Sequence, residues 1–151
     1  MSIKIIKKIL ILALFYFTFI TLNAEENLKR VGKFKDWESF ILSKDGNKTC
    51  FAQSIPILRA PKKFARDPSR LFISFRPKEN IKDEISVTSG YEFKAKGTVT
   101  AKSGKKTYDL FSKGRFAWVV DNEDEAKLIK IMKKASRLMI IGNTSKGNQT
   151  T

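Results

Sequence analysis

The chain has 151 residues, with 30 Lys and Arg against 15 Asp and Glu, and a formal net charge of +15 at pH 7. It has no histidine and one cysteine, which excludes Ser-His-Asp and Cys-His catalysis, an intrachain disulfide and the usual structural zinc sites. The positive charge predicts attraction to polyanions. The alternative is that the lysines, which are distributed along the chain, only make the surface soluble.

The first 24 residues have the three parts of an export signal. Lys4, Lys7 and Lys8 form a positive start, the run Ile9 to Leu22 is uncharged, and Ala24 is a small residue at the expected cut. The run is shorter than the roughly 18 to 20 residues of a membrane-spanning helix. We therefore expect cleavage near Ala24, no stable transmembrane segment afterwards, and residence in the periplasm or at the cell surface. An uncleaved tether to the inner membrane is the alternative.

Residues 25–151 are predicted to form a single, mainly β domain of antiparallel, sandwich-like sheets. Short segments rich in Phe, Ile, Val and Thr alternate there with turn residues. The expected strands and hairpins, in chain order, are 37–42 with 49–55 around Asp45-Gly46, 71–76 ended by Pro77, 84–88 with 91–95 around Ser89-Gly90, 98–101 with 106–110, 115–120, and 138–141. In the segment 115–120, alternation places Phe116, Trp118 and Val120 on one face. We assign Phe116 and Trp118 to the core.

One helix is predicted, over about 122–135. Asn122 is placed to cap it, and Glu125 to complete a capping box. The acidic residues 123–125 complement the positive end of the helix dipole, which explains them without a metal site. An apolar stripe that includes Leu128 and Ile131 is expected to pack on the sheet.

The sequence predicts no catalytic, metal-binding or cofactor-binding residues. Asp83 and Glu84 are neighbours on an expected strand and would point to opposite faces, and no glycine-rich loop opens a helix. Cys50 lies in an expected strand, where a free thiol packs as a small core side chain. The segment 113–120 superficially resembles an RNA-binding aromatic strand, but its register is off by one residue. No specific nucleic acid partner is expected.

The candidate binding site begins in the segment between Pro56 and Pro68. Its prolines predict an irregular loop, and long cations on a loop meet phosphates or uronates at little desolvation cost. The residues assigned to polyanion binding are Arg59, Lys62, Lys63, Arg66, Arg70 and Arg76. A solvated connector is the alternative interpretation.

Several short motifs occur in a set order along the chain. They are Lys35-Asp36-Trp37, Thr49-Cys50-Phe51-Ala52, Phe75-Arg76-Pro77, Glu84-Ile85-Ser86-Val87 with Gly90-Tyr91, Asp109-Leu110-Phe111 with Ala117-Trp118, Met132-Lys133, and Gly142-Asn143-Thr144-Ser145-Lys146-Gly147. In this order they resemble the invasion-associated locus B family over nearly all of the chain after the signal. The resemblance implies an exported proteobacterial protein with a β-rich, sandwich-like domain. The family's name comes from an association with host-cell invasion, and it implies no defined reaction.

Two features depart from the family pattern. Many members have a second cysteine shortly after the tryptophan, where this chain has Phe40 and Ile41, so the resemblance implies that a family disulfide is lost. The family pattern also continues past Gln149-Thr150-Thr151 into a further strand. We therefore expect a chain that lacks the last strand of the family, with one sheet edge left unpaired.

Together these features predict an exported, non-catalytic module of the cell envelope or cell surface. Its expected partners are anionic envelope or host-surface polymers, bound without a cofactor. One alternative is a general periplasmic envelope-stress or scaffold protein with no host role. Another is an enzyme that acts on envelope polymers, which the missing histidine and the lack of paired carboxylates disfavour.

Overall fold

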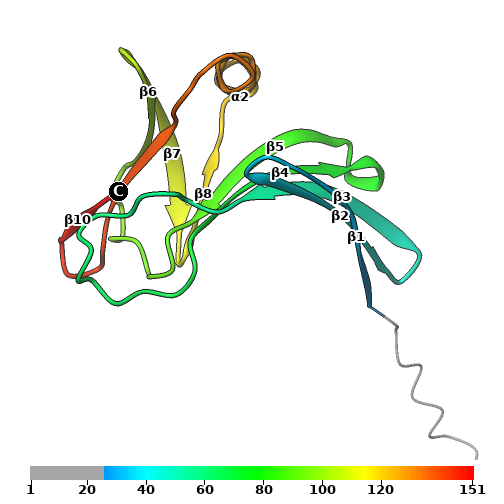
Figure 1. The fold of residues 1–151 in the computed structure, drawn as a ribbon, viewed down its shortest axis with the longest axis horizontal. Coiled ribbons are helices and arrows are strands. Elements are labelled where there is room, and N and C mark those ends of the chain that lie inside the picture. Colours follow the sequence, from blue (N-terminus) through cyan, green and yellow to red (C-terminus); the bar gives the residue numbers. More distant parts are fainter. Residues whose placement is uncertain (1–25) are drawn as a thin grey trace, which may run out of the picture.

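A computed structural model describes residues 26–151, so the expected export signal lies outside the described residues (Figure 1). The ten strands form one antiparallel sheet in the order β1-β2-β3-β4-β5-β8-β7-β6-β9-β10. The strands are β1 (Asn27–Phe34), β2 (Trp37–Lys44), β3 (Asn47–Ser54), β4 (Arg70–Arg76), β5 (Ile81–Thr88), β6 (Val99–Ser103), β7 (Lys106–Lys113), β8 (Phe116–Val119), β9 (Met139–Asn143) and β10 (Gln149–Thr150). The helices are a 3-10 turn, η1 (Pro77–Glu79), and α2 (Asn122–Met132).

The prediction of a mainly β, antiparallel fold with one α-helix is confirmed. The β2–β3 hairpin turns at Asp45 and Gly46, whose φ angles of 50° and 71° are the left-handed values that a two-residue hairpin turn needs. The β6–β7 hairpin and the strands β4 and β9 also form where the sequence predicts them. The sandwich-like arrangement takes the form of one sheet that bends sharply, with β8 between its two halves (Figure 1).

The predicted hairpin around Ser89-Gly90 is wrong. β5 pairs instead with β8, with Ser86 opposite Trp118, and the segment 91–95 forms only a single bridge, between Phe93 and Thr144. A long-range partner therefore replaces the local one. The first strand, β1, is absent from the prediction because its sequence is basic and lacks a regular apolar alternation.

The hydrophobic core lies between α2 and the concave side of the bend. Its buried side chains come from β5 to β8, from the segment before β6 and from the centre of the helix. They are Ile85, Val87, Phe93, Val99, Ala101, Tyr108, Leu110, Ala117, Val119 and Leu128. Burial of this set supplies the apolar stabilisation of the fold.

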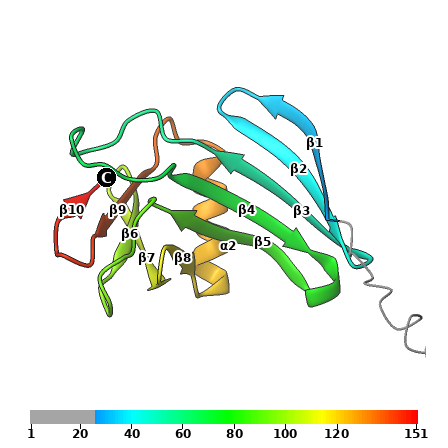
Figure 2. The same ribbon diagram turned by 90° about the horizontal axis from the view of Figure 1, so that it is seen from below.

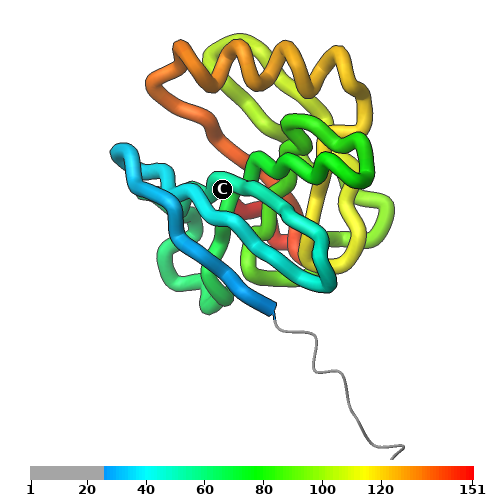
Figure 3. Tube along the Cα trace, turned by 90° about the vertical axis from the view of Figure 1, so that its right-hand side faces the viewer, coloured from blue at the N-terminus to red at the C-terminus, as the bar shows by residue number. Residues whose placement is uncertain are grey.

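The four N-terminal strands extend beyond the reach of the helix. We call β1 to β4 the wing; its strands lie side by side with β5 in Figure 2, and Figure 3 shows α2 on one side of the molecule and β1 and β2 on the other. Within the described chain, no residue before Ile85 is buried. Cys50 is therefore only half-buried, which corrects its assignment as a core side chain. The wing is a single layer with both faces partly open.

The face of β8 is also opposite to the one predicted. Phe116 is 43% exposed, whereas its neighbour Ala117 is fully buried. Phe116 stacks on Trp118, with ring centroids 6.0 Å apart, on the side of the strand away from the core. The small Ala117 and Val119 face the helix instead, because bulky rings would not fit between two closely packed layers.

The cap of the helix lies one residue earlier than predicted, and the helix ends at Met132, before the predicted end near residue 135. The side chain of Asp121, not Asn122, caps it by accepting hydrogen bonds from the backbone N–H groups of Glu123 (2.8 Å) and Asp124 (2.9 Å). Glu125 does not complete a capping box. Its carboxylate accepts a 2.6 Å hydrogen bond from the backbone N–H of Ile85, so it connects the helix to β5.

Glu125 gives a testable pH dependence. Burial raises the pKa of its carboxyl above the ordinary value of 4.5, and the charges of Glu84 and Asp83 add to this effect, although the bond from Ile85 opposes it. A raised folded-state pKa stabilises the protein below the unfolded pKa, and this contribution is lost as pH rises through the folded pKa. Gln does not titrate and keeps an acceptor oxygen. The free energy of unfolding in urea is measured for wild type and Glu125→Gln at pH 4 and pH 7. The stability of the variant relative to wild type should be higher at pH 7 than at pH 4. A difference that is independent of pH would contradict this role.

Candidate functional site

The basic loop, residues 55–69 between β3 and β4, is fixed to the folded domain at two places. Ala60 and Thr151 exchange two main-chain hydrogen bonds, each 2.9 Å long. Near the other end of the loop, the backbone N–H of Asp67 donates to the carbonyl of Gly90 at 3.1 Å. Between these points, the guanidinium of Arg66 donates to the main-chain oxygen of Thr151 at 3.0 Å. These contacts set the path of a loop that has no regular secondary structure.

Gly90 is the residue on which the second attachment depends. Its φ is +78°, and a Cβ added there would lie 1.9 Å from the carbonyl oxygen of Asp67, so only glycine fits. Arg115 completes the attachment by donating to the Gly90 carbonyl at 3.0 Å and by pairing with the Asp67 carboxylate. Asp67 is the only acidic residue of the loop, and its charge is thus neutralised by an arginine outside the loop.

An aromatic contact supports the middle of the loop. The rings of Phe64 and Tyr91 pack edge to face with centroids 5.9 Å apart, and the centroids of Tyr91 and Phe93 of the core are 5.2 Å apart. Phe93 in turn approaches Gly142 of β9 so closely that a Cβ at Gly142 would lie 2.7 Å from the ring. The loop is therefore packed onto the core through a chain of three rings.

Three of the six predicted site residues are exposed on this fixed loop. Arg59, Lys62 and Lys63 are exposed, and within residues 26–151 they form no ion pair. Arg66 is half-buried, and its guanidinium connects the loop to Thr151. Burial lowers the pKa of its guanidinium, and the nearby charge of Arg59 lowers it further, while Tyr91 has the opposite effect. Two positive charges are therefore held close together.

The other two predicted residues lie on β4. Arg70 is its first residue, adjacent to the loop and half-buried, and forms no ion pair within the described part of the chain. Arg76 is its last residue, about 20 Å further along at roughly 3.3 Å per residue. The guanidinium of Arg76 makes two 2.9 Å hydrogen bonds to Glu84 and one to Glu79. The hydrogen bonds to Glu84 are the main reason why the pKa of the Arg76 guanidinium is raised. The structure thus places Arg70 next to the loop but not Arg76. Arg76 instead connects the end of β4 to η1 and β5 through its hydrogen bonds.

The sequence interpretation overlooked the apolar part of the site. Ile55, Ile57 and Leu58 are 57%, 82% and 70% exposed. Ile57 and Leu58 line a shallow hollow of about 370 Å³ together with cations of the loop, including Arg59 and Lys62. The sequence does contain a signal for it, an apolar stretch directly before the cations, but the predicted strand 49–55 includes the first of these residues, Ile55.

Other features of the described residues offer less chemistry. A wider, open hollow of about 760 Å³ lies between the segment 92–98 and β7, and its lining mixes Lys94 and Lys113 with Glu92 and Asp109. Within residues 26–151, no three His, Cys, Asp or Glu side chains are grouped to hold a metal ion. No helix in that part of the chain is long and apolar enough to cross a membrane.

The attachment at Gly90 can be tested by adding a methyl group. Gly90→Ala should lower the free energy of unfolding by roughly 2 to 4 kcal/mol, because it combines a strained φ with a clash against backbone. Gly104→Ala is the matched control: Gly104 also has a positive φ, of +58°, but has open space around it, so the cost should stay near 1 kcal/mol. Urea unfolding measures both. Equal costs would contradict the close approach of Asp67 to Gly90.

Comparison with known proteins adds no relative. No protein-family model, no curated protein and no solved structure matches the chain. Inference about function therefore rests on the sequence patterns and on the charges, contacts and exposure of the described residues.

Proposed function

We propose that the protein is an exported, non-catalytic module of the cell envelope or cell surface, of the invasion-associated locus B type, that binds anionic partners through its basic loop. The export-signal pattern and the order of the short motifs support this proposal. The mainly β architecture with one helix agrees with the fold that the resemblance implies.

One observation carries the binding role: the loop is fixed while its cations are exposed. The contacts of Ala60 and Asp67 hold the loop, and Arg115 neutralises its only acid. Arg59, Lys62 and Lys63 therefore present a net positive surface on a backbone already in place. Such preorganisation lowers the entropy cost of binding. An anion near Arg59 would also relieve its repulsion with Arg66.

The side chains that could do acid-base chemistry support a non-catalytic role. The chain has no histidine, which is the most frequent general base. Glu84 is paired with Arg76, Asp67 with Arg115, and Glu125 with the backbone of β5. Each of these carboxylates therefore already has a structural partner.

The binding role can be tested by reversing two loop charges. Lys62→Glu combined with Lys63→Glu should elute from immobilised heparin at lower salt than wild type, with a weaker dependence on salt concentration, because fewer cations meet the polyanion. Lys105→Glu combined with Lys106→Glu is the control, since it makes the same change in net charge at the β6–β7 turn. Elution of the loop variant together with this control would contradict the proposal.

A second candidate function, that of a scaffold, is favoured by the wing. Aromatic rings line one of its faces: Phe40 stacks on Phe51 at 5.2 Å, and Phe51 meets Phe72 at 6.1 Å. On the opposite face, Cys50 lies between Ile41 and Phe75 in register. Both faces are partly open, which is typical of surfaces that another protein covers.

The scaffold role makes Cys50 a reporter. A partner on the wing should slow maleimide labelling of Cys50 in intact cells relative to the purified protein. Lys106→Cys in a Cys50→Ser background controls for access of the reagent, and it should label equally fast in both settings. Equal labelling rates for Cys50 as well would count against a scaffold.

A further inference from the structure

Residues 57–63, which we call the tip of the basic loop, expose apolar side chains beside their cations. Ile57 and Leu58 are among the most exposed large apolar residues of the described chain, at 82% and 70%. Adjacent exposed apolar side chains on a fixed loop mark an interaction surface more often than isolated ones do. The two main-chain bonds between Ala60 and Thr151 fix the backbone two residues after Leu58.

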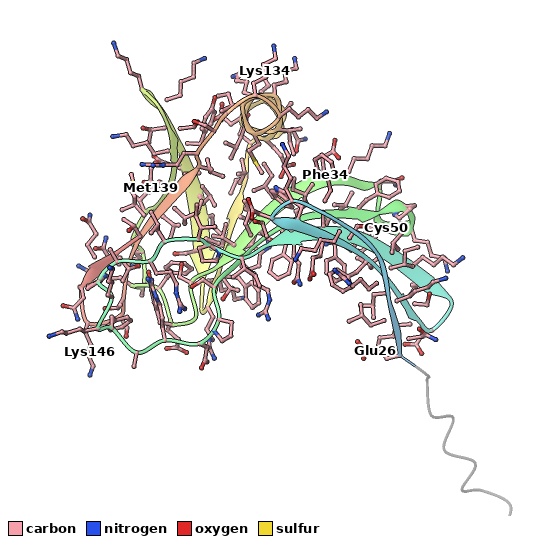
Figure 4. All side chains as sticks on the ribbon, viewed as in Figure 1. Glu26, Phe34, Cys50, Lys134, Met139 and Lys146 are labelled. Carbon is pink, nitrogen blue, oxygen red and sulfur yellow. The ribbon has the colours of Figure 1, made fainter. Side chains whose placement is uncertain are left out.

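Cationic and apolar groups share one surface at this tip. Ile57, Leu58, Arg59 and Lys62 line the same shallow hollow of about 370 Å³. The loop lies at the end of the molecule opposite α2, beside the β9–β10 turn (Figure 1). Figure 4 shows a further cation, Lys146, at that end, whereas Lys134 lies at the helix. A flat anionic surface could therefore meet the tip without contacting the helix.

We infer that the loop tip inserts into the surface of a membrane that contains anionic lipid. Ile57 and Leu58 enter the boundary between headgroups and acyl chains, while Arg59, Lys62 and Lys63 reach the lipid phosphates. Interfacial binding of this kind combines buried apolar area with attraction to anionic headgroups. Long lysine and arginine side chains span the distance between the two layers. The inference rests on the proposed function and names the class of its anionic partner.

A lipid surface fits the tip better than a hydrophilic polyanion does. A polysaccharide or a nucleic acid would satisfy the cations but would leave Ile57 and Leu58 in water. An anionic bilayer offers both phosphates and an apolar phase within a few ångströms of each other. The occurrence of both kinds of side chain in one hollow therefore favours an amphiphile.

The test compares variants in binding to vesicles of phosphatidylglycerol and of phosphatidylcholine. Each protein is used in the form that cells produce from the full-length gene, with its N-terminus identified by mass spectrometry. Ile57→Ser combined with Leu58→Ser should weaken binding to phosphatidylglycerol vesicles about tenfold and leave heparin elution unchanged. Lys62→Ala combined with Lys63→Ala should weaken vesicle binding about fivefold per lysine and also lower heparin retention.

Two controls separate insertion from general stickiness. Leu28→Ser combined with Val31→Ser removes two exposed apolar side chains from β1, where they are 57% and 58% exposed, and should leave vesicle binding unchanged. A polarity-sensitive dye on Leu58→Cys in a Cys50→Ser background should shift to the blue with phosphatidylglycerol vesicles. The same dye on Lys105→Cys should not shift.

The outcomes for the inference and for the proposed function are distinct. Wild-type affinity of the Ile57 and Leu58 serine variant for phosphatidylglycerol vesicles, or an unshifted dye at position 58, would overturn lipid insertion. If the loop charge reversal still lowered the salt concentration of heparin elution in that case, the proposed function would stand with a hydrophilic partner. If the loop charges affected neither heparin nor vesicle binding, both proposals would fail.

Discussion

One helix has to cover a ten-stranded sheet, and this limit determines how the rest of the molecule is stabilised. Leu128 of α2 is fully buried against the concave side of the bend, where Ile85, Val87 and Ala117 lie. The hydrogen bond that the backbone N–H of Ile85 donates to the Glu125 carboxylate fixes the helix at this place. Since α2 covers only one half of the sheet, apolar burial is concentrated there. The wing and the basic loop must be held by other means.

The basic loop shows what those means are. It is attached by main-chain hydrogen bonds of Ala60 and Asp67 and by the packing of Phe64 on Tyr91. None of these contacts uses Arg59, Lys62 or Lys63. Because the backbone and one ring attach the loop, its long cationic side chains remain available for binding. The loop is a candidate binding site because different groups attach it and contact a partner. Arg66 does both, since its guanidinium attaches the loop through its hydrogen bond to Thr151 and also adds positive charge.

Local sequence signals predicted the parts of the fold that local physics determines. Asp45-Gly46 permits a tight turn, and Pro77 ends a strand, so the elements around them formed as expected. The faces of β8 could not be predicted, because alternation shows that Ala117 and Trp118 face opposite sides but not which side meets the helix. The sequence favours the core for Phe116 and Trp118 only as the simpler alternative to an RNA-binding strand, and this argument does not decide which face meets the helix.

The candidate site was predictable as a stretch of sequence but not as a surface. In the sequence alone Arg76 is equivalent to the loop cations, and only the pairing of β4 with β5 brings Glu84 to its guanidinium. The importance of Gly90 likewise depends on a contact with Asp67 that is distant in sequence.

Native-state amide hydrogen exchange tests most directly whether the exposed loop is held in place. The amides of Ala60 and Asp67 should be protected, although the loop has no strand or helix of its own, while neighbouring amides that lack partners exchange rapidly. Exchange of both amides at the rate of an unstructured peptide would contradict a fixed display of cations.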